Sequence, residues 1–155
     1  MRSAQQSRLM KNGYTLPEKG SDPIQMEKIM EIKQQIDVRA APDEVYDTLM
    51  SSEKFAAFTN TAAEIDASTG GKFSCFDGQI TGIQLENIAG ELIVQSWRVS
   101  FWPEDVFSTV RIEMTASQDG TTLNLTHSDF PADMLEHLEP GWHNKYWEPL
   151  KAYFA

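Results

Sequence analysis

Cysteine is almost absent from this chain of 155 residues, because Cys75 is the only one. A single cysteine excludes an intramolecular disulfide framework, a zinc site built from cysteines alone and a Cys-x-x-Cys redox pair. No apolar run approaches the ~20 residues that a membrane-spanning helix needs. Residues 1–12 also lack the apolar core of a secretory signal. We therefore expect a cytoplasmic protein without membrane insertion.

Basic residues are also scarce, with 13 Lys and Arg against 23 Asp and Glu and a net charge of -10. Such a charge repels a phosphate backbone at long range, so nucleic acid is not an expected partner. In contrast, hydrophobic residues make up 41% of the chain and include 8 Phe, 4 Trp and 4 Tyr. A chain of this length can bury roughly 70% of its unfolded surface, which predicts one domain with a substantial core.

Residues 1–25 differ from the remainder of the chain. They contain few apolar side chains, are interrupted by Gly and Pro, and carry a net charge of +2 against -12 for residues 26–155. We interpret them as a flexible N-terminal arm, which could lie on the acidic domain formed by residues 26–155. A disordered arm and a true start at Met26 are the alternatives.

Apolar residues alternate with polar ones from Met30 to Val38, the pattern of a half-buried strand. Pro42 and the acidic residues after it suit the start of a helix, and two short helices are predicted over residues 42–58. Gly70-Gly71 forms a turn. The strand-like segments after this turn, separated by turn sequences, are residues 72–76, 79–85, 92–101, 106–116 and 121–130. No helical segment separates them, which predicts an antiparallel sheet of six strands in all.

The C-terminal segment is predicted to be helical. Pro131 and Pro140-Gly141 bracket a short piece over residues 132–138, and a longer helix over 142–154 is expected to kink at Pro149. At about 100° per residue one stripe of this helix is apolar and largely aromatic. Its members are Trp142, His143, Tyr146, Trp147, Leu150, Tyr153 and Phe154. Such a helix should lie on a sheet.

Several short motifs occur in a characteristic order. They are Ala41-Pro42-x-x-Val45-Tyr46-x-x-Leu49, Gly70-Gly71-x-Phe73, Asp77-Gly78-x-Ile80-x-Gly82, Gln95-Ser96-Trp97-Arg98, Gly120-Thr121-x-Leu123-x-Leu125-Thr126-His127 and Gly141-Trp142-x-x-x-Tyr146-Trp147-x-x-Leu150. Over residues 30–154 the chain resembles the START-like (Bet v 1-like) superfamily. Within that superfamily it resembles the family named for the activator of the heat-shock-protein-90 ATPase. The resemblance implies an α+β helix-grip fold, in which a curved antiparallel sheet wraps around a long C-terminal helix.

Eight residues are expected to line a cavity between the sheet and the last helix. They are Trp97, Phe101, Val110, His127, Trp142, Tyr146, Trp147 and Leu150. Rigid aromatic rings around a concavity favour an apolar ligand, although aromatic residues at these spacings equally suit a filled core. His127 is in register with Leu123 and Leu125 and should point inward. It would then either bond Tyr146 or His143 as a structural residue or contact a ligand.

Other chemistry has little support in the sequence. His127, Asp129, His137 and His143 occur in one stretch, but their spacing matches no metal-binding helix motif, so neither metal nor cofactor is expected. Cys75 lies between Phe73 and Phe76 and is interpreted as a buried, inert thiol.

Three functions remain open at this point. The first is non-catalytic binding of a small hydrophobic or amphipathic ligand. The second is a co-chaperone-like protein-interaction module acting on a partner ATPase, with exposed sheet and loop surface as the contact. The third is an enzyme related to START-like cyclases and hydrolases, with His127 or Asp129 as the acid or base. A monomer or a weak homodimer suits each of them.

Overall fold

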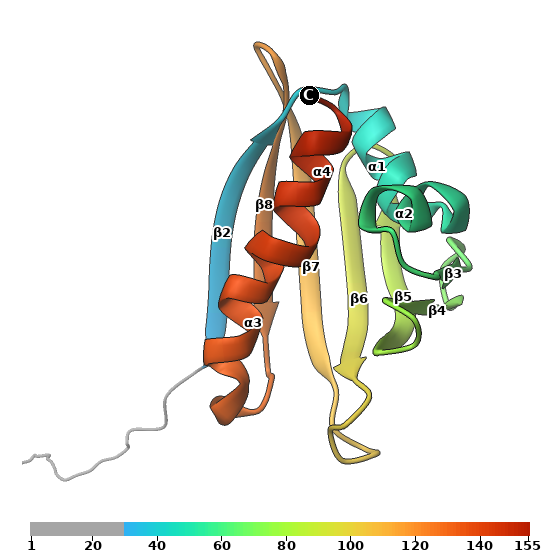
Figure 1. The fold of residues 1–155 in the computed structure, drawn as a ribbon, viewed down its shortest axis with the longest axis vertical. Coiled ribbons are helices and arrows are strands. Elements are labelled where there is room, and N and C mark those ends of the chain that lie inside the picture. The colour runs from blue at the N-terminus through green and yellow to red at the C-terminus, as the bar shows by residue number, and fades with distance from the viewer. Residues whose placement is uncertain (1–29) are drawn as a thin grey trace, which may run out of the picture.

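The computed structural model describes residues 30–155, so the expected arm over residues 1–25 lies outside the described residues. One antiparallel sheet organises the described chain, with the strand order β2-β8-β7-β6-β5-β4-β3 (Figure 1). The strands are β2 (Glu31–Val38), β3 (Glu64–Ile65), β4 (Lys72–Cys75), β5 (Ile80–Ile88), β6 (Leu92–Val99), β7 (Ser108–Ser117) and β8 (Gly120–Ser128). Strands β3 to β8 pair in sequence order, and β2 joins the far edge beside β8.

This architecture confirms the α+β helix-grip fold, with one correction to the strand count. Over the described residues the sheet has seven strands in place of six, because Glu64 and Ile65 pair with Ser74 and Phe73 of β4. A strand of two residues is too short to show a period-2 pattern, so the sequence gives no signal for it.

Two short helices, α1 (Pro42–Met50) and α2 (Ser52–Thr59), follow β2 as predicted. Pro42 begins α1, and the acidic residues next to it suit the positive end of the helix dipole. Ser51 caps α2, since its hydroxyl accepts a hydrogen bond from the Lys54 backbone N–H at 3.2 Å. Asn60 ends this helix with a left-handed φ of 58°.

The C-terminal helical segments join end to end. They are η1 (Ala132–Met134), α3 (Leu135–Gly141), η2 (Trp142–Trp147) and α4 (Glu148–Tyr153). Together they form a rod, which we call the C-terminal rod, that crosses in front of β2, β8 and β7 (Figure 1). The break expected at Pro140-Gly141 is wrong, because Pro140 lies inside α3 and η2 continues directly as a π-helix.

The π-helical turn changes which residues of the rod face the sheet. The Glu148 N–H bonds the His143 carbonyl five residues back, and Trp142 stacks on Trp147 with ring centroids 5.3 Å apart. The wider turn therefore buries Trp142 and Trp147 together, whereas His143 and Tyr153 leave the expected stripe and are exposed.

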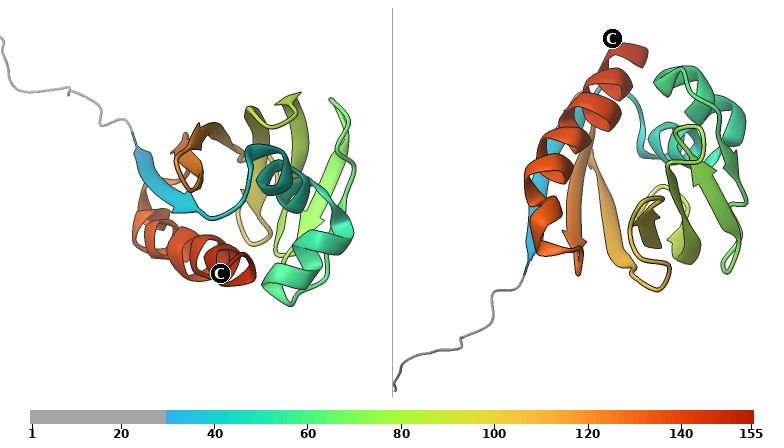
Figure 2. Two further views of the ribbon diagram at one scale, coloured as in Figure 1. Left: turned by 90° about the horizontal axis from the view of Figure 1, so that it is seen from above. Right: turned by 60° about the horizontal axis from the view of Figure 1, so that its bottom comes forward.

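The core lies between the concave face of the sheet and the helices (Figure 2). Inward residues of neighbouring strands pair directly, with Val110 opposite His127 and Ile112 opposite Leu125. The rod covers one half of this face, and α4 also contacts α2 at the far end. Because the helices gather on this one side, no helix of residues 30–155 covers the convex face of the sheet.

Candidate functional site

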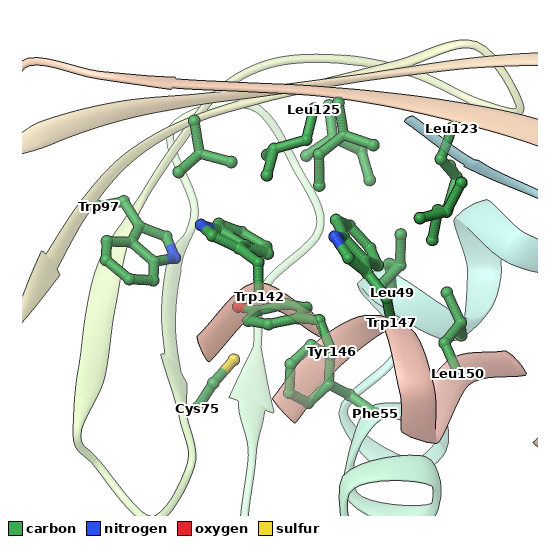
Figure 3. Close-up of a cluster of buried hydrophobic side chains, with 14 of the residues drawn as sticks. Leu49, Phe55, Cys75, Trp97, Leu123, Leu125, Trp142, Tyr146, Trp147 and Leu150 are labelled. Atoms are coloured by element: carbon green, nitrogen blue, oxygen red, sulfur yellow. The ribbon is translucent and has the colours of Figure 1, made fainter. Parts of the chain in front are cut away.

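Trp142 lies at the centre of a packed aromatic cluster between the rod and the sheet (Figure 3). Its ring stacks on Trp97 with centroids 5.8 Å apart, and the Tyr146 ring lies 4.2 Å away. Phe55 of α2 reaches the cluster edge-on, 5.7 Å from Tyr146. These contacts join the sheet, the rod and α2 in one core.

His127 is completely buried beside this cluster, and both of its ring nitrogens are hydrogen-bonded. Trp142 Nε1 donates to Nδ1 at 3.0 Å. Ser108 Oγ donates to the Trp97 carbonyl and lies 2.8 Å from Nε2, so Nε2 carries the proton of a neutral imidazole. Burial lowers the pKa of His127 to about 3, which keeps the ring neutral. Its partners are thus Ser108 and Trp142, in place of Tyr146 or His143.

The interior around the cluster is filled. The space enclosed by Leu49, Phe55, Cys75, Trp142 and their neighbours is about 10 Å³, too little for more than one water molecule. Burial raises the pKa of the Cys75 thiol to about 12 and also raises the pKa of Tyr146. In this part of the molecule the aromatic residues act as core.

The eight residues expected to share one cavity divide into two sets. Val110, His127, Trp147 and Leu150 are at most 1% exposed and belong to the core. Trp97, Phe101, Trp142 and Tyr146 line a groove of about 360 Å³, which we call the rod groove. Phe101 was expected inside a strand, but β6 ends at Val99 and leaves Phe101 in the following loop, 73% exposed.

A wider depression of about 680 Å³ lies over β4, β5 and the β6–β7 loop. We call it the sheet depression, and its lining includes Ile83, Arg98, Glu104 and Phe107. Ile83 and Phe107 are both exposed although they are large and apolar. Exposed apolar side chains beside a concavity are typical of contact surfaces.

Arg98 organises one wall of the sheet depression. Its Nη2 donates to the carbonyls of Trp102 and Pro103, at 2.5 and 3.0 Å, and thereby holds the β6–β7 loop. The guanidinium lies 5.8 Å from the centre of the Phe107 ring. Arg111 of the neighbouring strand β7 forms an ion pair with Glu113 of the same strand at 2.9 Å.

Sequence reasoning missed the sheet depression, although one signal was present. Phe107 has the same outward orientation as Thr109 and Arg111. Solvent-facing strand positions are usually polar, so an aromatic residue there indicates a contact surface. The other walls come from β4 and β5, and their approach to the β6–β7 loop depends on the register of three strands.

Within residues 30–155 the structure does not bring the candidate acid–base and metal-ligating residues together. His127 is sealed in the core whereas Asp129 is exposed, so the two do not face a common space. Within residues 30–155 no three His, Cys, Asp or Glu side chains come close enough to hold a metal ion. Over the same residues no helix has the length and apolar character needed to cross a bilayer.

Known proteins show clear similarity to the chain. A family described as "Activator of Hsp90 ATPase homolog 1-like protein" matches residues 39–155. The activator of 90 kDa heat shock protein ATPase homolog 1 of Homo sapiens is 32% identical over 115 residues, covering 74% of this chain and 34% of that protein. The corresponding homologue of Dictyostelium discoideum is 30% identical over 138 residues, covering 87% and 36%. The chain thus spans about a third of the length of these curated relatives.

Among solved structures, an HSP90 activator from Plasmodium falciparum superposes with a TM-score of 0.73 and 26% sequence identity. The superposition covers 82% of this chain and 96% of that one. The shared region therefore includes nearly the whole of the Plasmodium structure.

Proposed function

The chain belongs to the family of Activator of Hsp90 ATPase homolog 1-like proteins, and on that basis we propose that it is a protein-interaction module that binds a chaperone ATPase of the Hsp90 type. The names of its relatives describe activation of that ATPase, and we extend this activity to the chain as part of the proposal. The proposal places the protein in the cytoplasm with its partner. It takes up the co-chaperone-like alternative raised by the sequence.

One contrast carries the proposal. The enclosed space next to Phe55, Cys75 and Trp142 is only about 10 Å³, whereas the convex side of the sheet has a depression of about 680 Å³. Ile83 and Phe107 are exposed there, and the Arg98 guanidinium lies over the Phe107 ring. Aromatic and Arg side chains dominate the energetics of protein interfaces. A binding surface on the outside suits a protein partner better than an enclosed small ligand.

The charge of the domain indicates the kind of partner surface. Residues 30–155 carry a net charge of -12, and the sheet depression is lined by three acidic residues, Glu64, Asp66 and Glu104, against two basic ones, Lys72 and Arg98. An acidic surface steers a basic patch of a partner toward it and speeds association at low salt. We therefore expect the chaperone surface that meets this depression to be basic around an apolar centre.

The test measures binding of the full chain to the purified Hsp90-type ATPase of its source organism, together with the ATP hydrolysis rate. Phe107→Ser should raise the Kd at least about tenfold, the effect of removing an interface hot spot. Tyr153→Ser is a matched control, since Tyr153 is 45% exposed against 46% for Phe107 but lies on α4. Absence of binding by the unaltered chain, or equal loss in the two variants, would overturn the proposal.

A second candidate function is binding of a small hydrophobic or amphipathic ligand in the rod groove. The groove volume of about 360 Å³ lies within the ~300–1,000 Å³ of ordinary ligand sites. Four of the residues expected from the sequence line it, namely Trp97, Phe101, Trp142 and Tyr146. A ligand panel that raises the Tm of the unaltered chain but not of Phe101→Ser would support this function.

A further inference from the structure

The rod groove is walled largely by aromatic rings. Phe76, Trp97, Trp142 and Tyr146 form its buried floor, and Phe101 stands at the rim. The floor rings pack against one another, with the Phe76 and Tyr146 centroids 5.2 Å apart. Phe101 is different, because most of its surface meets solvent and leaves a ring face free for a ligand.

The full charges of the groove lining balance, and the rod beside the groove carries additional carboxylates. Glu136 and Lys145 are the lining residues with a full charge, and no ion pair joins them. Asp133 and Glu139 lie on the same stretch of the rod as Glu136. Together with the net charge of -12 for residues 30–155, these carboxylates favour a positively charged occupant.

We infer that the rod groove binds a small organic cation with apolar substituents, of the trimethylammonium type. Such a cation is attracted to the faces of aromatic rings. It is weakly hydrated, so its transfer from water to the groove costs little free energy. Its methyl groups can pack against apolar lining residues such as Met134 and Leu138, and the negative Glu136 carboxylate attracts its positive charge. This inference rests on the second candidate function, and names the ligand class for that site.

Lys145 makes it possible to test whether the ligand is positively charged. It is the fixed cation among the lining residues, so it repels a positively charged ligand and reduces its affinity. Removing the Lys145 charge should strengthen binding, whereas removing the Glu136 charge should weaken it. A purely hydrophobic groove would respond to neither substitution.

The experiment compares choline with 3,3-dimethyl-1-butanol, which has the same shape without the charge. Each is titrated into the ¹⁵N-labelled full chain while the indole N–H signals are followed by NMR. Choline should shift the signals of Trp97 and Trp142, which line the groove, in a saturable manner. Trp147 serves as an internal reference, because it does not line the groove and its N–H is bonded to Gln34 of β2. The neutral analogue should bind at least about fivefold more weakly.

Variants of exposed residues then locate the interaction. Phe101→Leu should raise the choline Kd about 2- to 5-fold and Phe101→Tyr should not, because only an aromatic face supplies the attraction. Glu136→Gln should raise it about 2- to 5-fold and Lys145→Gln should lower it. Glu148→Gln is the control, since it makes the same change in net charge at an exposed residue outside the groove lining.

Equal binding of choline and its neutral analogue would overturn the inference but leave the second candidate function standing. Absence of any saturable shift with both compounds would overturn both. Equal effects of Glu136→Gln and Glu148→Gln on the choline Kd would also contradict the inference. They would mean that choline responds to the net charge of the protein and not to a carboxylate in the groove.

Discussion

Trp142 of the rod donates its indole N–H to Nδ1 of His127 on strand β8, across 3.0 Å and out of contact with solvent. The other nitrogen of the same ring bonds Ser108 on β7. One buried imidazole thus connects two neighbouring strands to the helix that covers them. Because both ring nitrogens are used and the ring is sealed, we assign His127 a structural role.

Replacing His127 with Leu should lower the free energy of unfolding by about 2–4 kcal/mol. The change leaves Trp142 Nε1 without an acceptor and removes the Ser108 contact, and each unpaired buried polar group costs about 1–3 kcal/mol. Chemical denaturation followed by tryptophan fluorescence measures it. Ser108→Ala, which removes one of the two bonds and leaves Trp142 paired, should cost less. A His127→Leu protein as stable as the original would contradict the structural role.

Acid should destabilise the fold through His127. The pKa of this group falls from 6.5 to about 3 on burial, so the unfolded chain binds the proton more readily. The stabilising contribution is therefore complete above pH ~6.5 and is lost as the pH falls toward 3, by about 1.4 kcal/mol per pH unit in between. NMR titration of the ring should show it neutral at pH 5. A ring that is protonated at pH 5 in the folded protein would contradict the assignment.

The parity of the strands could be predicted because it depends on local alternation. Val110, Leu123, Leu125 and His127 all point inward as their spacing indicated. Partners across the core could not be predicted in the same way. Which residue meets His127 depends on how the rod is rotated above the sheet, and the π-helical turn after Pro140 sets that rotation.

The sheet depression and the rod groove could not be predicted from the sequence for a similar reason. Each draws its lining from segments far apart in the sequence, and both use the β6–β7 loop. Phe101 was a site candidate from the sequence and lines the rod groove, but its exposure depends on where β6 ends. A strand end set by hydrogen bonding to β5 and β7 is not encoded in the alternation of the segment itself.

Gln34 should contribute more to stability than its neighbour Gln35. Its Oε1 accepts the Trp147 indole N–H at 2.7 Å and its Nε2 donates to the Glu139 carbonyl at 3.0 Å, so it fastens the rod to β2. We expect Gln34→Ala to lower the free energy of unfolding by about 1–3 kcal/mol. Gln35→Ala is the control on the opposite face, where the exposed side chain bonds Asn124. Equal denaturation midpoints for the two variants would refute this difference.

Two glycine-to-alanine substitutions should have opposite effects on stability. Gly82 lies on β5 opposite Trp97, and a Cβ there would overlap the Ser96 carbonyl and the Phe73 ring. Neither the backbone oxygen nor the buried ring can move freely. Gly82→Ala should therefore lower the free energy of unfolding by about 3 kcal/mol, the upper end of the range typical of overpacking.

Gly141 has helical dihedral angles and open space around its Cβ position. Gly141→Ala should therefore stabilise the rod by about 0.5–1 kcal/mol, because alanine loses less backbone entropy in a helix. Thermal unfolding of both variants checks the pair. A lower Tm for Gly141→Ala would mean that the junction between α3 and the π-helical turn requires glycine for a reason other than space.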